Sequence, residues 1–156
     1  MRGEAPASEL RVRGLRLADL PGILRIERRS FATPWSLLDF AFELAKPSSI
    51  CLAALADGQL AGYLVCSRQD ELWHVMNLAV DSARRRRGIG SALLRELLDQ
   101  RGRADARYVL ETRQSDSGAI ALYERFGFRV AGVRPGFYRD NGEEALIMWR
   151  TPPPES

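Results

Sequence analysis

The chain has 156 residues, 46% of them hydrophobic, which suits a single domain that buries one core without metal or disulfide staples. No apolar run approaches the roughly 20 residues that span a bilayer, and the polar N-terminus has no signal-peptide pattern, so we expect a cytoplasmic protein. The net charge is +3 and acidic residues are spread along the chain, so no specific nucleic-acid binding is expected. We expect one domain over residues 10–150, with flexible termini at residues 1–9 and 151–156.

The hydrophobic pattern alternates between strand and helix periods along the chain. In chain order it predicts a strand, two helices, three strands, a helix, a strand, a helix and two strands, over residues 10–17, 20–31, 35–45, 50–56, 59–66, 71–80, 90–100, 107–112, 117–126, 128–131 and 145–150. This order indicates a mixed α/β (α+β) sheet with helices on its faces.

Local signals mark several boundaries. Thr33 is the expected N-cap of the second helix, and Asp57-Gly58 is a hairpin turn between antiparallel neighbours. Gly102 is expected to end the third helix in a left-handed conformation. A two-residue hairpin turn would place Cys51 opposite Leu64 and only diagonal to Cys66, so both thiols are expected to be reduced.

The most informative segment is residues 77–91, where a strand leads through four arginines to Gly88, Gly90 and a leucine-rich helix. A helix N-terminus presents unpaired backbone N–H groups and the positive end of its dipole, and glycine lets a ligand approach the backbone. The pattern predicts an anion site that suits a pyrophosphate. It matches neither a P-loop nor a dinucleotide-binding turn. A solvated charge run and RNA binding by the same arginines are the alternatives.

Arg85-x-x-Gly88-x-Gly90 resembles the Gln/Arg-x-x-Gly-x-Gly/Ala motif of GNAT acetyltransferases. Further matches extend the resemblance over nearly the whole chain and favour the RimI type, which acetylates the N-terminal alanine of a ribosomal protein. They are Phe31, Pro34, Trp35 and Ser36, then Leu110-Glu111-Thr112-Arg113, Ala119 to Glu124, Gly127-Phe128, Tyr138, Glu143-Glu144-Ala145 and Met148. The resemblance implies the GNAT fold, a mostly antiparallel mixed sheet of about seven strands flanked by helices on both faces.

The resemblance also implies that acetyl-CoA is the cofactor, with its pantetheine arm along the strand and its pyrophosphate over the glycine turn. The implied cofactor-binding residues are Leu78, Ala79, Val80, Arg85, Arg86, Arg87, Gly88, Ile89, Gly90, Ser91 and Asp116. Asp116 departs from the family pattern, which has asparagine there. A carboxylate cannot donate the amide's hydrogen bond, so capping the helix that begins near Ser117 is the better-supported role for Asp116. No metal is implied.

By the same resemblance, Glu111 is the general base and Tyr123 the acid that protonates the thiolate. A solvent-facing strand position for Glu111 and a core position for Tyr123 are the alternatives. His74 is the only histidine, and the resemblance gives it no proton transfer, so a structural role is expected. The implied acceptor groove contains Phe31, Trp35, Tyr138 and Glu143, with ordinary core packing as the alternative for the aromatic residues.

These features predict an enzyme that transfers acetyl from acetyl-CoA to the α-amine of a protein, most simply a ribosomal protein that begins with alanine. Acetylation of a small amine, such as a polyamine or antibiotic, uses the same fold and is a second reading. A non-catalytic acetyl-CoA-binding or RNA-associated module is a third. We expect a monomer or weak dimer without membrane association.

Overall fold

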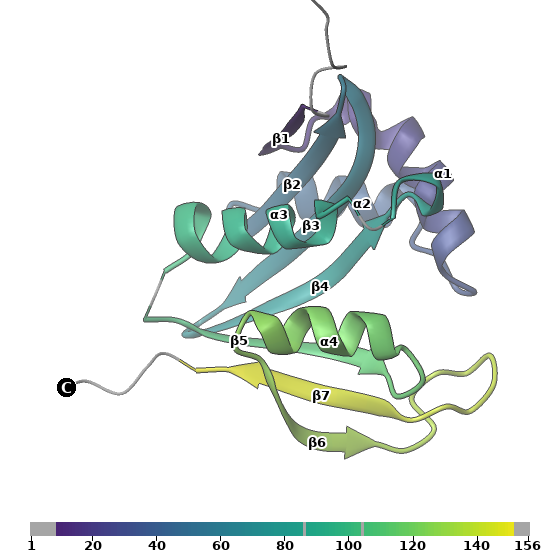
Figure 1. Cartoon of the computed structure of the whole chain (residues 1–156), viewed down its shortest axis with the longest axis vertical. Coiled ribbons are helices and arrows are strands. Elements are labelled where there is room, and N and C mark those ends of the chain that lie inside the picture. Colours follow the sequence, from purple (N-terminus) through teal and green to yellow (C-terminus); the bar gives the residue numbers. More distant parts are fainter. Residues whose placement is uncertain (1–8, 86, 104, 152–156) are drawn as a thin grey trace, which may run out of the picture.

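The computed structural model describes residues 9–85, 87–103 and 105–151, and its strands form one seven-stranded sheet (Figure 1). The spatial order is β1-β2-β3-β4-β5-β7-β6. Only the β4–β5 pair is parallel among the described strands. The strands are β1 (Leu10–Gly14), β2 (Ser49–Ala56), β3 (Gln59–Gln69), β4 (Leu72–Val80), β5 (Arg107–Arg113), β6 (Arg129–Arg134) and β7 (Ala145–Arg150). The predicted mixed and mostly antiparallel sheet is confirmed.

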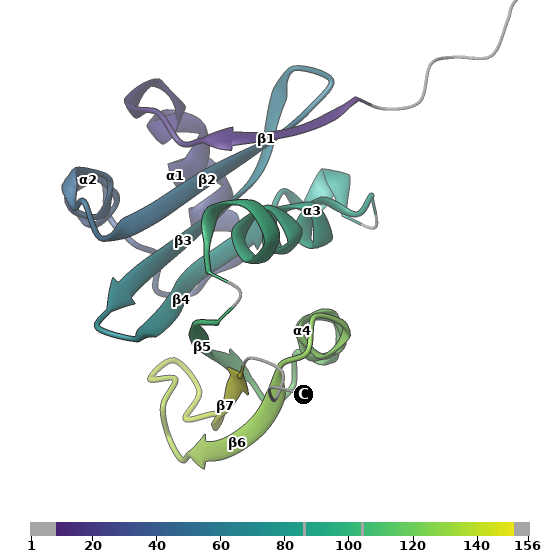
Figure 2. The same ribbon diagram turned by 90° about the vertical axis from the view of Figure 1, so that its left-hand side faces the viewer.

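Helices cover both faces of the sheet (Figure 2). The α-helices are α1 (Leu20–Ser30), α2 (Leu37–Ala45), α3 (Ile89–Arg95) and α4 (Ser117–Arg125), and α3 continues as a π-helix over Glu96–Arg101. One core cluster packs α1 and α2 against the sheet, with Ile23 and Phe40 at its centre, and a second packs α3 and α4 on the opposite face around Leu93 and Phe128. None of the described helices is both long and apolar enough to cross a membrane.

The start of α2 differs from the prediction, because Ser36 and not Thr33 is the N-cap. The Ser36 hydroxyl accepts from the amide of Asp39 at 3.2 Å, and the Asp39 carboxylate accepts from the Ser36 amide at 2.8 Å. This reciprocal pair needs an acidic or amide side chain three residues after the cap. Asp39 stands in that position relative to Ser36, whereas the residue three after Thr33 is Ser36 itself.

Gly102 ends the third helix, but the predicted left-handed conformation is wrong. Its φ is −94° and its ψ is −165°, which is extended backbone. A Cβ on Gly102 would overlap the Tyr108 hydroxyl oxygen and would lie 2.7 Å from the carbonyl oxygen of Leu97. Glycine is therefore required here by lack of space, since Tyr108 is fully buried beneath the end of the helix.

The β2–β3 hairpin has the predicted turn, with φ of 52° at Asp57 and 81° at Gly58. A bulge between Ala54 and Leu55 shifts the register, so Cys51 lies opposite Val65 and not opposite Leu64. Both cysteines are free, as expected, and burial raises the pKa of the Cys51 thiol to about 11 and that of the Cys66 thiol to about 12.

Two irregularities in β4 create the space in which a site can form. The register with β3 shifts at Met76, which is a bulge, and the side-chain alternation inverts there. Trp73 and Val75 pack on the α3/α4 face, whereas Ala79 packs on the α1/α2 face. In addition, β4 pairs with β5 only as far as His74 and Val109, after which the two parallel strands separate (Figure 1).

Candidate active site

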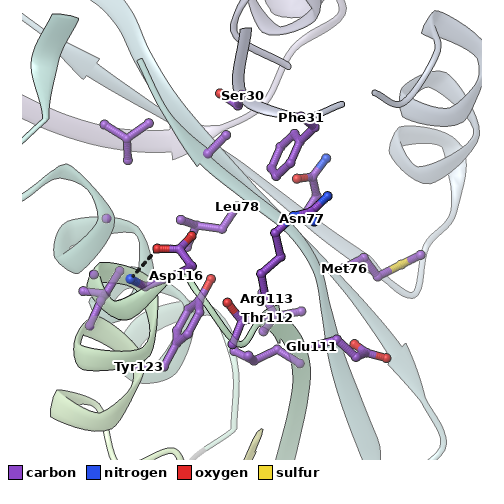
Figure 3. Close-up of a pocket in the computed structure, with 18 of the residues that line it drawn as sticks. Ser30, Phe31, Met76, Asn77, Leu78, Glu111, Thr112, Arg113, Asp116 and Tyr123 are labelled. Atoms are coloured by element: carbon purple, nitrogen blue, oxygen red, sulfur yellow. Dashed lines mark hydrogen bonds between the residues drawn. The ribbon is translucent and has the colours of Figure 1, made fainter. Parts of the chain in front are cut away.

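A cavity of about 830 Å³ lies where β4 and β5 separate (Figure 3). Its walls come from both faces of the sheet: the end of α1 and the loop to α2 on one side, and the starts of α3 and α4 on the other. The residues of β4 beyond His74 have no strand partner on this side among the described residues, so their backbone N–H and C=O groups are free to bind an extended ligand.

One end of the cavity is an anion site at the start of α3. Gly88 is the N-cap, with a left-handed φ of 77° that favours glycine, and the first helical hydrogen bond is donated by Ala92 to the Gly88 carbonyl at 2.9 Å. The N–H groups of residues 89–91 precede that bond and have no helical acceptor. Arg85 and Arg125 line the same end, so dipole, amides and guanidinium groups all favour an anion.

The structure brings together most of the predicted cofactor-binding residues. Those that line the cavity are Leu78, Ala79, Val80, Arg85, Gly88, Ile89, Gly90, Ser91 and Asp116. Arg87 is exposed and does not line it. Arg86 lies outside the described residues. The glycines explain the close approach of the helices, because a Cβ on Gly90 would lie 3.0 Å from a methyl group of Leu122 on α4.

Asp116 caps α4, as predicted, and also faces the cavity. Its carboxylate accepts from the amide of Ala119 at 3.0 Å (Figure 3). This bond satisfies one of the N–H groups that a helix start leaves open. The same carboxylate lies among the cavity-lining groups, so it places a negative charge near Tyr123 and contributes to the raised pKa of that phenol.

Glu111 lies in the middle of β5 and lines the cavity, with its side chain 19% exposed. Its Oε2 is 2.6 Å from Nε2 of His74, which is the last β4 residue that pairs with β5. The hydrogen bond with His74 is the main cause of a lowered pKa for Glu111. Glu111 lies on the more accessible face of β5, alternating with buried neighbours, and that face borders the cavity. The expected structural role of His74 takes the form of direct contact with the Glu111 carboxylate.

Tyr123 belongs to both the core and the cavity. Its ring packs edge-on against Phe128 at 5.8 Å between centroids, and 8% of the residue remains exposed. Its hydroxyl is directed into the cavity (Figure 3). Burial, helped by the charge of Asp116, raises the pKa of Tyr123 above its ordinary value, so the phenol stays protonated at neutral pH.

The far wall of the cavity is the loop between α1 and α2. Phe31 and Trp35 both line it, as predicted for an acceptor groove. Trp35 also packs on Phe40 at 5.1 Å between ring centroids, so core packing and cavity lining are combined in one side chain. Phe31 is 37% exposed, which leaves its ring accessible from the cavity.

The opposite wall is the loop between β6 and β7. Tyr138 lines the cavity, and the Arg113 guanidinium lies 4.1 Å from its ring centroid. Glu143 does not line the cavity. Its carboxylate accepts from the amide of Ser115 at 2.7 Å and from Arg113 at 3.2 Å, and these bonds lower its pKa to about 2. The geometry therefore shows Glu143 occupied in holding the loop to the end of β5, together with Asp140, which binds Arg113 at 2.9 Å.

The sequence reasoning missed Glu27, which lines the cavity from α1 and is 1% exposed. Glutamate on the buried face of a helix, next to Ile26, was a signal, because an ionisable group without a partner is costly in a core. Its partners come from three other segments of the chain, which no local pattern could identify.

The chain matches the model of the acetyltransferase (GNAT) family over residues 20–128. It is 38% identical over 148 residues to a protein of Bacillus subtilis (strain 168) described as a putative ribosomal protein bS18-alanine N-acetyltransferase, covering 90% of this chain and 94% of that one. It is 35% identical over 140 residues to the ribosomal protein bS18-alanine N-acetyltransferase of Escherichia coli (strain K12), covering 88% and 94%. The crystal structure of the ribosomal-protein-S18-alanine N-acetyltransferase from Escherichia coli superposes with a TM-score of 0.85 at 31% identity, covering 95% and 97%.

The splayed strands, the glycine turn at a helix start and these similarities define one class of protein. The chain belongs to the GNAT family of acetyltransferases. Acetyl-CoA is the acetyl donor of this family, and the described residues fit it. The anion site suits the pyrophosphate, and the open edge of β4 suits the pantetheine arm. The Glu111 carboxylate and the Tyr123 phenol lie where the thioester would follow.

Proposed function

We propose that this protein acetylates the N-terminal α-amine of another protein. The proposed substrate is ribosomal protein bS18, whose N-terminal alanine is the acceptor named for the relatives. The single observation that carries the proposal is the cavity between β4 and β5, which joins an anion site at one end to Glu111 and two loop walls at the other. The names of the relatives supply the acceptor.

Coenzyme binding is assigned to residues along the first half of the cavity. The N–H groups of residues 89–91 and the guanidinium groups of Arg85 and Arg125 bind phosphate, and the free edge of β4 binds the amide-containing arm. Asp116 caps α4 rather than binding phosphate, since its negative charge would repel one. When bound, the coenzyme supplies an acetyl thioester.

Glu111 accepts the proton of the attacking amine, directly or through a water molecule. An α-amine has a pKa of about 7.7 to 8.0, so a useful fraction is neutral near pH 7 and a carboxylate is a sufficient base. Its hydrogen bond with His74 fixes the carboxylate orientation at the point where the strands part. Tyr123, kept protonated by burial, donates a proton to the departing thiolate from the opposite side of the cavity.

The two loop walls select a chain end over a small amine. Phe31 and Trp35 on one side and Tyr138 on the other leave a slot between two elements of the fold, which suits an extended peptide entering by its N-terminus. A small polyamine would leave this slot largely unfilled.

The test uses labelled acetyl-CoA with peptides that copy the bS18 N-terminus, the same peptides with a blocked α-amine, and a set of polyamines and aminoglycosides. The proposal predicts label on the free peptides alone, and loss of that label with Glu111→Gln at unchanged acetyl-CoA affinity. Label on the small amines with none on any peptide would contradict it. Binding of acetyl-CoA without transfer to any acceptor would point to a non-catalytic module.

A further inference from the structure

Glu27 is a buried carboxylate that lies beside the catalytic cavity and takes no part in the chemistry described above. One of its oxygens, Oε1, accepts from the Tyr63 hydroxyl on β3 and from the Asn77 side-chain amide on β4, the latter at 2.8 Å. Its other oxygen, Oε2, accepts from the backbone amide of Trp35 at 2.9 Å. Tyr63 is fully buried and Asn77 is 7% exposed, so the carboxylate has three donors from three segments within the core.

Glu27 therefore holds both ends of the loop that forms the acceptor wall. Its backbone carbonyl accepts from the Phe31 amide at 3.0 Å, where α1 ends, and its carboxylate accepts from the Trp35 amide, just before α2 begins. Between these two bonds, the amides of Ala32 and Thr33 have no hydrogen-bond acceptor among the described residues. The loop that forms this wall of the cavity is therefore held at both ends by hydrogen bonds to one residue, Glu27.

The same carboxylate sets that wall at a fixed distance from β4. Asn77 follows the bulge at Met76, and its neighbours Met76 and Leu78 line the cavity on the open edge of the strand. Because Oε1 binds Asn77 while Oε2 binds Trp35, the loop and the strand are joined through a single rigid group. A buried charge-assisted network of this kind holds its members in one arrangement.

We propose that Glu27 is a positioning residue for the acceptor, fixing the wall formed by residues 31–35 against β4 and so setting the width of the slot that receives the peptide. The proposal rests on the proposed function for the identity of the acceptor. It assigns Glu27 no proton transfer and no contact with the coenzyme. Its effect is on acceptor binding and not on the anion site at the start of α3.

Glu27→Gln tests this assignment, with Tyr63→Phe as the matched control. Glutamine has one acceptor oxygen in place of two, so its side chain can accept either from the Trp35 amide or from Tyr63 and Asn77, and not from both sides at once. Tyr63→Phe removes a donor from the same carboxylate but leaves the bonds to Trp35 and Asn77. Both variants lose stability in the core, and only one loosens the loop.

The expected result is a rise of about tenfold in KM for the bS18 peptide with Glu27→Gln, while KM for acetyl-CoA stays within about twofold of the wild-type value. Tyr63→Phe should leave both constants within about twofold even where its Tm falls. An unchanged peptide KM with Glu27→Gln would overturn the proposal. An equal rise with Tyr63→Phe would do the same, because it would reduce the effect to general stability.

Hydrogen exchange in the wild-type protein gives a second measurement that needs no variant and no acceptor. The Trp35 amide should be protected, whereas the amides of Ala32 and Thr33 should exchange rapidly. Exchange of Trp35 as fast as Thr33 would show that the anchor does not hold and would overturn the proposal. If the wild-type protein acetylates no peptide, that result contradicts the proposed function and not the role of Glu27. The exchange rate of the Trp35 amide then tests the role of Glu27 without any acceptor.

Discussion

His74 and Glu111 form a hydrogen bond of 2.6 Å, between Nε2 and Oε2, where β4 and β5 separate. His74 is the last β4 residue that pairs with β5, whereas Glu111 lies two residues beyond its pairing partner Val109, and both side chains line the cavity. The position of the base is thereby tied to the point from which the cavity opens.

Replacing His74 should change the pH dependence of the reaction in a defined direction. The His74 hydrogen bond is the main cause of the lowered pKa of Glu111, so in His74→Ala that pKa rises toward its ordinary value of about 4.3. Glu111 must be a carboxylate to act as base, and in the variant its protonation begins at a higher pH. The ratio of variant to wild-type kcat/KM should therefore fall between about pH 6 and pH 4. Ionisation of the amine affects both proteins equally and cancels in this ratio. A constant ratio over that pH range would contradict the assignment of Glu111 as the general base held by His74.

Gly90→Val should weaken acetyl-CoA binding. A Cβ at this position already lies 3.0 Å from Leu122, and two further methyl groups would push α3 from α4 and cover the amides of the anion site. We expect a loss of at least about tenfold in affinity, roughly 1.4 kcal/mol, measured by calorimetry. Gly14→Val on β1 is the control, since a Cβ there meets nothing within 4 Å, and its affinity should equal that of the wild type. Equal affinities for both variants would count against our placement of the phosphates.

Asp116→Asn separates capping from charge. Asparagine caps helices about as well as aspartate, so thermal stability should change little, while removal of the negative charge beside the cavity should leave acetyl-CoA affinity equal or tighter. Asp116→Ala should instead lose about 1 kcal/mol of stability with the cap. Weaker coenzyme binding in the asparagine variant would show that the carboxylate itself assists the coenzyme.

Glu143 should stabilise the β6–β7 loop in a pH-dependent manner. Hydrogen bonds from Ser115 and Arg113 lower its pKa to about 2, against about 4.3 in the unfolded chain. Its contribution is therefore complete above about pH 4.3 and is lost as the pH falls through about 2. Glu143→Gln should lower Tm at pH 7, and the difference from the wild type should shrink progressively below pH 4. The control is Glu124→Gln at an exposed position of α4, which should leave Tm at pH 7 close to the wild-type value.

The arrangement of strands and helices could be read from the sequence because it follows from local periodicity. The seven strands, the four helices, the turn at Asp57-Gly58 and the cap at Asp116 all depend on residues close together in the chain. The glycine turn could be assigned for the same reason, since Gly88 and Gly90 act on the backbone beside them.

What the sequence could not reveal depends on contacts between distant residues. The bulge at Met76 inverts the faces of β4, and no local pattern distinguishes it from regular alternation. His74 was expected to be structural because the resemblance gives it no proton transfer, and its contact with Glu111 could not be predicted because the two residues are 37 positions apart. Glu27 was missed because its partner Asn77 lies 50 residues away. Glu143 was predicted to bind substrate, whereas its partners Arg113 and Ser115 come from the end of β5.

The most direct test of the proposed function is mass spectrometry of purified, unacetylated ribosomal protein bS18 after incubation with acetyl-CoA and this protein. We expect one acetyl group, located on the α-amine of the first residue, and none when Glu111→Gln replaces the wild-type protein. Acetylation confined to lysine side chains, or an unmodified bS18 under conditions in which a small amine is acetylated, would contradict it.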